Sequence, residues 1–588
     1  MLWAAFDFPR HPLAREDGER MRGAFYAPPS RWLRASTHAE LSAVIDAAHQ
    51  AAFAGAWVLG GLRFEAAAAF DSALAVHPTQ QPLAEFAVYD SAPEPWPTGL
   101  PSAALTSDWQ DDQSSADSAA RIERIRDWIR AGDCYQVNLT TRLQARLHAD
   151  PADLFLALHA SQPGGFSLFL REAGVASVSP ELFFDWRPVP LPDGSAQTSW
   201  LLAAQPMKGT AARGADKVAD DAAQGHLRTS EKERAENLMI VDLLRNDISR
   251  VAQLGSVRVP RLFELHALPT VWQMTSTITA VSRPGLRLSE VFAALFPCGS
   301  VTGTPKVRAM QIIRDLEPMP RNFYCAALGL IQPGGVATFN VPIRTVEQDG
   351  SALVCGIGSA ITLDAEPAAE LAEWRAKARF LARAQAPIAA LETLRLEEGS
   401  YLRLDAHLAR LQRTAQHFGL RVSMSKVRAA LAIRPEGIWR VRLTVGALGE
   451  ITLQHQPLAE TREPVVLALA DSPIAGDNEF LRHKTTRREV YQPFVDAKPT
   501  AAFDALLWNE AGELTECCIG NIALLIDSQW LTPGREAGLL PGVLREEMLA
   551  SGQLREACLT LADLQRAEAL AFLNSLRGFV PAVMHCTK

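Results

Sequence analysis

The chain has 588 residues, too many for a single hydrophobic core, so we expect two or more domains. Hydrophobic residues make up 48% and charged residues 21% of it, as in an ordinary soluble globular protein. The net charge of −8, without a long basic run, argues against a nucleic-acid partner.

The N-terminal segment and the cysteines indicate a cytoplasmic protein without membrane association. Asp7 and Pro9 come too early for a signal peptide, and the most apolar stretch, 51–62, is too short to span a bilayer. The eight cysteines show no CxxC spacing, and only Cys517 and Cys518 adjoin. This usage is typical of a reduced protein without a structural zinc site.

Hydrophobic periodicity predicts alternating helices and strands over the first two-thirds of the chain. A helix starts near Ser118, with Ile122, Ile125 and Ile129 on one face, and stops at Gly132. Strand-like segments occur at 135–139, 166–170, 182–186, 201–206, 336–341 and 353–356.

Two further helices and a boundary complete this outline. Ser230 and Glu233 form a capping box for a helix that runs to Ser249. Another helix, 368–386, stops at Pro387, and a strand and hairpin turn follow at 388–399. We therefore expect one domain over 1–385 and a second over 386–588.

Lys208, in the sequence QPMKGT, is the most informative residue of the first domain. Pro206 and the turn at Gly209 and Thr210 restrain it, unlike an ordinary surface lysine. Acidic segments flank it, with Glu181 in SPELF upstream and the run ERAENLMIVDLLRND downstream. In a pocket lined with carboxylates, such a lysine is a candidate nucleophile.

Two helices carry pairs of glutamates three residues apart, so each pair shares a helix face. Glu233 and Glu236 form one pair; Glu370 and Glu373 form the other, with Lys377 one turn further on. Facing carboxylates repel unless a cation such as Mg²⁺ lies between them and a substrate acid. Taken alone, such pairs are more often solvated helix faces.

Glycine-rich turns and one arginine add anion-binding features. The segment GSVTGTPK (299–306) opens into a helix and offers backbone N–H groups, and GIGS (356–359) lets a ligand approach the backbone. Arg344 in VPIRTV can bind a carboxylate through two hydrogen bonds. A simple helix cap and a structural arginine are the alternatives for these features.

In this order, the motifs closely resemble those of the chorismate-utilising family: anthranilate synthase large subunits, aminodeoxychorismate synthases and isochorismate synthases. The resemblance covers about residues 120–385 and implies a mixed α/β (α+β) fold, a two-layer β-sandwich with flanking helices. It implies Mg²⁺ ligation by Glu236 and Glu373, with Glu233 and Glu370 supporting the ion through water. The implied contacts for chorismate are Ser300, Thr302, Tyr324, Arg344, Lys377 and the amides of Gly356 and Gly358.

Within that family, the residue at position 208 separates the members. Anthranilate synthases usually carry alanine there, whereas aminodeoxychorismate synthases carry a lysine that attacks the ring and is then displaced by ammonia. Glu181 resembles the acid that helps the ring hydroxyl leave. Gln273 stands where relatives often have a histidine that matters for expelling pyruvate, which fits an enzyme that keeps its enolpyruvyl group.

The chain shows no motif resembling the nucleophile elbow of a glutamine amidotransferase. The ammonia is therefore expected from a separate glutaminase subunit or from solution.

The last two hundred residues contain a second candidate lysine, Lys484. Arg482, Arg487 and Arg488 surround it in sequence and should lower its pKa by like-charge repulsion, which favours a free amine that can form a Schiff base. A basic surface strip is the alternative. Further on, Gly542 precedes a helix whose amides can hold a phosphate.

This region, 388–585, resembles the fold-type IV pyridoxal-phosphate enzymes: branched-chain and D-amino-acid aminotransferases and aminodeoxychorismate lyases. The resemblance implies that Lys484 is the Schiff-base lysine, that Glu516 keeps the pyridine nitrogen protonated and that Thr393 lies near the reacting ring. It allows a homodimer through this domain. The implied phosphate contacts are Arg410, Asn521, Ile522 and Val543.

These motifs alone do not separate a lyase from an aminotransferase. Fusion to the first domain favours a lyase, and we therefore predict a bifunctional enzyme that converts chorismate to 4-aminobenzoate for folate synthesis. The alternatives are an anthranilate synthase component fused to an unrelated aminotransferase, and a C-terminal domain that only docks a partner.

Overall fold

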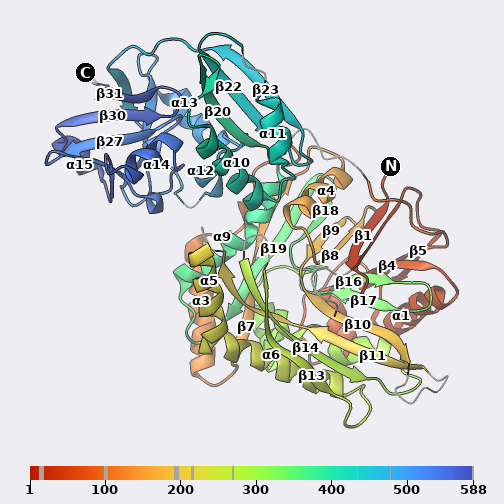
Figure 1. The fold of residues 1–588 in the computed structure, drawn as a ribbon. Helices are drawn as coiled ribbons and strands as arrows, with labels where there is room; N and C mark the ends of the chain where they lie inside the picture. Colours follow the sequence, from red (N-terminus) through yellow and green to blue (C-terminus); the bar gives the residue numbers. More distant parts are fainter. Residues whose placement is uncertain are drawn as a thin grey trace. The chain divides into compact units, whose positions relative to one another are not determined.

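The computed structural model describes residues 1–11, 13, 19–97, 104–190, 198–213, 217–267, 271–432, 435–476 and 478–585. These residues form two compact units, Met1–Ala386 and Pro387–Lys588, whose elements are labelled in Figure 1.

The described part of the first unit contains two large antiparallel sheets. In the first, the strands run in the order β15 (Gly303–Thr304), β7 (Gln136–Arg146), β19 (Ala352–Ile361), β18 (Thr345–Asp349), β9 (Val175–Ser179), β8 (Phe166–Leu170), β1 (Ala4–Pro9) and β2 (Arg20–Phe25), with β6 (Gln110–Asp111) beside β7. In the second, the order is β12 (Met207–Ala212), β14 (Val271–Val281), β11 (Thr198–Gln205), β10 (Leu182–Pro190), β17 (Ala337–Asn340), β16 (Ala327–Ile331), β4 (Trp57–Leu62), β5 (Ala84–Tyr89) and β3 (Arg31–Ala35), with β13 (Arg258–Ala267) beside β14.

The two sheets share a hydrophobic core, as in a β-sandwich. Phe6 and Phe8 from β1 of the first sheet belong to the same buried cluster as Leu59 of β4 and Leu328 of β16 from the second. Because alternate residues of a strand face opposite sides, the remaining faces are free for helices. The mixed α/β sandwich predicted from the sequence is confirmed, and each predicted strand segment overlaps a strand, with differences of one residue at some ends.

Helices flank the sandwich (Figure 1). They are α1 (His38–Phe53), α2 (Ala67–Phe70), α3 (Ser115–Arg130), α4 (Pro151–Ser161), α5 (Lys217–Thr229), α6 (Glu231–Ser249), α7 (Leu288–Leu295), α8 (Lys306–Leu316) and α9 (Pro367–Ala384), with short 3-10 turns at Phe64–Ala66 and Gly299–Val301. The Ser230 hydroxyl accepts a hydrogen bond from the Glu233 amide at 3.3 Å, which confirms the predicted start of α6.

The second unit also contains two sheets in its described residues. The smaller runs β21 (Ser400–Tyr401), β20 (Ala390–Glu397), β22 (Trp439–Val445) and β23 (Ile451–Pro457). The larger runs β26 (Leu514–Cys517), β25 (Asp504–Trp508), β24 (Val465–Leu469), β31 (Gly578–Met584), β30 (Ala569–Asn574), β27 (Asn521–Ile526), β28 (Gln529–Pro533) and β29 (Arg555–Ala557).

The helices of this unit are α10 (Leu404–Phe418), α11 (Met424–Ala430), α12 (Glu479–Arg482), α13 (Gln492–Ala497), α14 (Val543–Ala550) and α15 (Leu561–Arg566), with 3-10 turns at Glu489–Tyr491 and Arg535–Ala537. Across the described ranges of both units, every helix is too short or too polar to cross a membrane.

Candidate active sites

Lys208 lies on β12, where two neighbouring elements hold its backbone. The Asn237 side chain of α6 donates a hydrogen bond to the Lys208 carbonyl at 3.3 Å, and the Ser276 hydroxyl donates to Asn237 at 2.6 Å. The Gln273 amide donates to the Gly209 carbonyl at 3.0 Å, and Gly209 adopts a φ of +90° that favours glycine. The lysine side chain therefore projects from a fixed point.

Several charged groups surround the Lys208 amine although they are far apart in the sequence. Burial lowers the pKa of Lys208, Glu181 raises it, and Lys377 lowers it further. Glu236 and Glu373 also act on it, which brings α6 and α9 to the same site. Because a lowered pKa increases the fraction of neutral amine, Lys208 is suited to act as a nucleophile.

Glu181 is buried beside this lysine, with 3% of its surface exposed. Burial raises the pKa of Glu181, while a hydrogen bond from Ser300 and the charge of Lys208 lower it. Its Oε1 atom has no hydrogen-bond partner among the described residues. A carboxyl group in this state can keep a proton and donate it to a leaving group.

The predicted metal-binding glutamates face one another across α6 and α9. Burial raises the pKa of Glu233 and of Glu236, and Glu373 adds repulsion to both. A Cβ atom on Gly209 would lie 3.2 Å from Glu233 Oε2, so this acid reaches the Lys208 turn. Within the described residues, no three His, Cys, Asp or Glu side chains gather tightly enough to hold a metal by themselves.

Glu370, the fourth of these acids, is already hydrogen-bonded. The Ser359 hydroxyl donates to it, and the Trp374 indole donates to Ser359 at 2.7 Å. This chain of contacts joins α9 to β19. Glu370 is therefore buried against β19, whereas the Glu373 side chain on the same helix is more exposed.

The glycines of β19 are required by close packing. A Cβ atom on Gly356 would lie 2.3 Å from the Tyr324 ring, so the tyrosine packs directly against the backbone there. The Lys377 ammonium donates a 2.9 Å hydrogen bond to the Gly358 carbonyl and lies 2.7 Å from Glu373 Oε1. Tyr324, Lys377 and the two glycines are therefore brought together.

Arg344 follows β17 with a φ of +52°, which is unusual for a residue with a side chain. Burial lowers the pKa of Arg344 to about 10, and Arg383 adds repulsion. Ser300 and Thr302 lie in the turn before α8, where the Thr302 hydroxyl donates to the Cys298 carbonyl at 3.0 Å. Both hydroxyl residues are buried, and Ser300 contacts Glu181.

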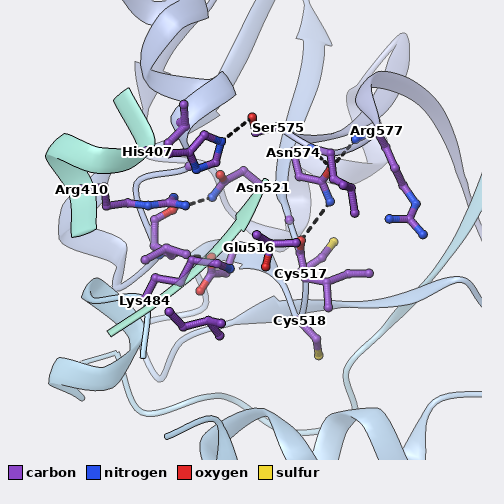
Figure 2. Close-up of a pocket in the computed structure, with 18 of the residues that line it drawn as sticks. His407, Arg410, Lys484, Glu516, Cys517, Cys518, Asn521, Asn574, Ser575 and Arg577 are labelled. Carbon is purple, nitrogen blue, oxygen red and sulfur yellow. Dashed lines mark hydrogen bonds between the residues drawn. The ribbon is translucent and has the colours of Figure 1, made fainter. Parts of the chain in front are cut away.

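The second unit has a cavity of about 200 Å³ that contains its candidate residues (Figure 2). Its lining includes Thr393, Arg410, Lys484, Glu516, Asn521 and Val543. Ile522 lies instead in the hydrophobic core, fully buried, and its side chain is not part of this lining.

Arg410 is held by a buried acid that the sequence analysis missed. Glu392 on β20 accepts two hydrogen bonds from the Arg410 guanidinium, at 2.7 and 2.9 Å, and one from His407 at 2.7 Å. Despite burial, Arg410 and His407 hold the pKa of Glu392 down at about 2. The sequence did contain a signal for this acid. Glu392, Leu394 and Leu396 are alternate residues of one strand and so face the same side, and a charge on the side that faces the core is unusual.

Lys484 has the lowered pKa that its sequence context predicted, but for a different main reason. Burial lowers the pKa of Lys484 to about 7, and Arg410 and Arg488 add repulsion. Arg488 was expected to contribute, whereas Arg410, the larger of the two charge effects, comes from a helix some 70 residues away in the sequence and was not expected; Arg482 and Arg487 are not among the largest causes. Burial, a tertiary contact with Arg410 and the sequence neighbour Arg488 therefore act together on the pKa of this amine.

Glu516 is buried in the cavity wall and makes two hydrogen bonds. The Tyr491 hydroxyl donates to Oε1 at 2.7 Å, and the Leu540 amide donates to Oε2 at 3.1 Å. Burial raises the pKa of Glu516 to about 7. Arg488 stacks on the Tyr491 ring, 4.3 Å from its centroid, so the tyrosine that donates to Glu516 is itself held in place.

The start of α14 forms another part of the wall. A Cβ atom on Gly542 would lie 2.1 Å from Asn521 Oδ1, so only glycine fits there. The Asn521 amide donates to the Leu540 carbonyl at 2.9 Å, and Arg410 donates to the Pro541 carbonyl at 3.3 Å. Arg410, Asn521 and the first amides of α14 thus converge on one end of the cavity.

Comparison with known proteins identifies the class to which these units belong. The chain belongs to the family described as chorismate binding enzyme, which matches residues 16–383. Residues 389–583 match a second family, described as amino-transferase class IV.

Named relatives resemble the first unit. Aminodeoxychorismate synthase component 1 from Salmonella typhimurium is 41% identical over 271 residues, 46% of this chain and 57% of that protein. Anthranilate synthase component 1 from Streptomyces coelicolor is 36% identical over 280 residues, 47% of this chain and 52% of that protein. The chain thus spans little more than half the length of these relatives.

Among solved structures, anthranilate synthase component I from Streptococcus pneumoniae has the same fold, with a TM-score of 0.50 and 21% identity. The match covers 64% of this chain and 91% of that one.

Proposed function

We propose that the chain is a bifunctional enzyme for 4-aminobenzoate synthesis. The first unit aminates chorismate to 4-amino-4-deoxychorismate, and the second eliminates pyruvate from that product. The observation that carries the proposal is the pairing of Lys208, with its lowered pKa, and the buried Glu181. The likeness to aminodeoxychorismate synthase component 1 supports it.

In the first unit, the neutral Lys208 amine attacks the ring of chorismate and displaces its hydroxyl group. Glu181 gives its proton to that hydroxyl, which leaves as water, and ammonia then displaces the lysine. Arg344, Tyr324 and Lys377 bind the carboxylates of chorismate. The buried Arg344 guanidinium makes no hydrogen bond or ion pair with another side chain among the described residues, which supports its role in binding a substrate carboxylate.

Mg²⁺ fits the acidic side of this site, held by Glu236 and Glu373 directly and by Glu233 and Glu370 through water. Burial raises the pKa of Glu233 and Glu236, and the neighbouring acids raise it further by repulsion, which a cation would relieve. The ion would neutralise a substrate carboxylate. Because the protein acids alone do not form a complete cluster in the described residues, the substrate acid is expected to complete the coordination.

Pyridoxal phosphate fits the cavity of the second unit. Lys484 offers a neutral amine, Glu516 can pair with a pyridine nitrogen, and Arg410, Asn521 and the start of α14 suit a phosphate. When bound, the cofactor supplies an electron sink to the carbon that carries the substrate amine. Lys484 Nζ takes the ring proton as the enolpyruvyl group leaves, and Thr393 lies beside the reacting ring.

Three features of the cellular context belong to this proposal. A separate glutamine amidotransferase subunit supplies the ammonia, since the chain shows no motif for one. The second unit forms a homodimer. A cytoplasmic location agrees with the seven cysteines in the described ranges, which are free thiols.

One incubation tests the proposal. The full chain is mixed with chorismate, ammonia, Mg²⁺ and pyridoxal phosphate, and the aromatic product is identified by chromatography and mass. We expect 4-aminobenzoate and pyruvate. Formation of 2-aminobenzoate would refute the proposal and identify an anthranilate synthase; accumulation of aminodeoxychorismate alone would refute the assignment of the second unit.

A further inference from the structure

Three arginines line the second unit's cavity without a role in holding the cofactor. Arg440 and Arg442 lie on β22, where they alternate with the fully buried Val441 and Leu443, so they point away from the core. Arg577 lies in the turn between β30 and β31 and lines the same cavity. Elements far apart in the sequence thus bring three positive charges to one space.

No carboxylate of the described residues lies within ion-pair or hydrogen-bond distance of these arginines. Among the described residues, no ion pair or hydrogen bond joins the guanidinium group of Arg440, Arg442 or Arg577 to a carboxylate, and Arg577 Nε is buried without any hydrogen-bond partner. Burial lowers the pKa of Arg577 and Arg440 lowers it further, so the two guanidinium groups lie close enough to repel. Within the described ranges Asp504 makes no ion pair with Arg577, but it raises the pKa of Arg577 and offsets this lowering only in part. A bound anion would relieve both the repulsion and the unsatisfied donor.

The arginine group occupies a different end of the cavity from the phosphate site. Figure 2 shows Arg577 and Asn574 on one side and His407 and Arg410 on the other. Arg410 is already paired with Glu392 and is fixed to the Pro541 carbonyl, whereas Arg440, Arg442 and Arg577 have no such ion pair in the described part of the chain. Asn574 braces the Arg577 turn by accepting a hydrogen bond from the Arg577 amide at 2.8 Å. The cavity therefore has two separate cationic ends.

We propose that Arg440, Arg442 and Arg577 bind a substrate carboxylate that is remote from the reacting amine. The proposal rests on the proposed function. It restricts the substrates of the second unit to cyclic amines that carry a carboxylate on the ring carbon opposite the amine. An α-amino acid carries its carboxylate one carbon from the nitrogen, where it would stay near Lys484. A ring amine with a carboxylate on the opposite ring carbon reaches the other end of the cavity. The arginine group thus selects against ordinary amino-acid substrates.

The test measures the second reaction alone in the full chain. Aminodeoxychorismate is supplied, chorismate and ammonia are omitted, and 4-aminobenzoate formation is followed by fluorescence for Arg577→Gln, Arg440→Gln and Arg442→Gln. Loss of a charge-assisted hydrogen bond should raise KM by about 10- to 100-fold with kcat changed much less. Arg577→Lys should recover part of the affinity.

Arg555→Gln is the matched control, because Arg555 is an exposed arginine of the same unit outside the cavity, and its KM should not change. Cofactor absorbance identical to that of wild type verifies that each variant is folded. Wild-type KM in all three cavity variants would overturn the inference, and so would a fall in kcat at constant KM. If wild type itself makes no 4-aminobenzoate, the proposed function fails instead, so the two failures are distinguishable.

Discussion

The buried Glu392 should be essential for the stability of the second unit. Its side chain is 1% exposed and neutralises Arg410, which is 8% exposed. In Glu392→Gln the carboxylate becomes a neutral amide of the same shape, so Arg410 remains buried without a counter-charge. The variant isolates this charge because the volume of the side chain is almost unchanged.

Two arguments give a similar loss in the free energy of unfolding. The pKa of Glu392 falls from 4.5 to about 2 on folding, which corresponds to about 3 kcal/mol of stability. Removing one partner of a buried pair typically costs about 3–5 kcal/mol. For a unit of this size, 3 kcal/mol lowers Tm by roughly 6–12 °C.

Calorimetry of wild type and Glu392→Gln at pH 7 measures the difference. Glu397→Gln on the same strand is the control, because Glu397 makes a more exposed ion pair with Arg395, at 3.0 Å, and should change stability by less than about 1 kcal/mol. Since the pKa of Glu392 is lowered in the folded state, its contribution is complete above about pH 4.5 and is lost as the pH falls towards 2. A Tm for Glu392→Gln equal to that of Glu397→Gln would refute the reasoning.

Four further predictions concern the proposed chemistry. Lys208→Ala should abolish or redirect ring amination while supplied aminodeoxychorismate is still converted; amination at a near wild-type rate would rule out a covalent role for Lys208. Glu236→Gln and Glu373→Gln should each weaken Mg²⁺ and chorismate binding together in calorimetric titrations, and unchanged binding in both would mean that these acids are only helix surface. Lys484→Ala should accumulate aminodeoxychorismate, which is detectable by mass, and borohydride should no longer fix the cofactor covalently. Addition of a separate lyase should restore 4-aminobenzoate formation. Full turnover in this variant would contradict the role of Lys484. Because burial lowers the pKa of Lys484 to about 7, its labelling by an amine reagent in cofactor-free wild type should rise through a midpoint near pH 7, well below the pKa of about 10.4 of an ordinary lysine side chain.

Local sequence patterns determined several elements of the first unit, including two that carry its site. The hydroxyl of Ser230 caps α6, periodic isoleucines form α3, and the turn at Gly209 follows Lys208. Each depends on residues within one or two turns of chain, so its physics can be read from a short window. The roles of Lys208 and Glu181 came from the order of motifs in a family, and remain predictions.

The contacts that give these residues their chemistry were decided by tertiary structure. Glu392 meets Arg410 across 18 residues, and Arg440 meets Arg577 across more than a hundred. The lowered pKa of Lys484 arises mainly from burial, with Arg410 as the first of its charged neighbours. Sequence alone set which charged side chains were available; folding set which of them lost water and which opposing charge each one met, because desolvation and Coulomb energy depend on distance in space rather than along the chain.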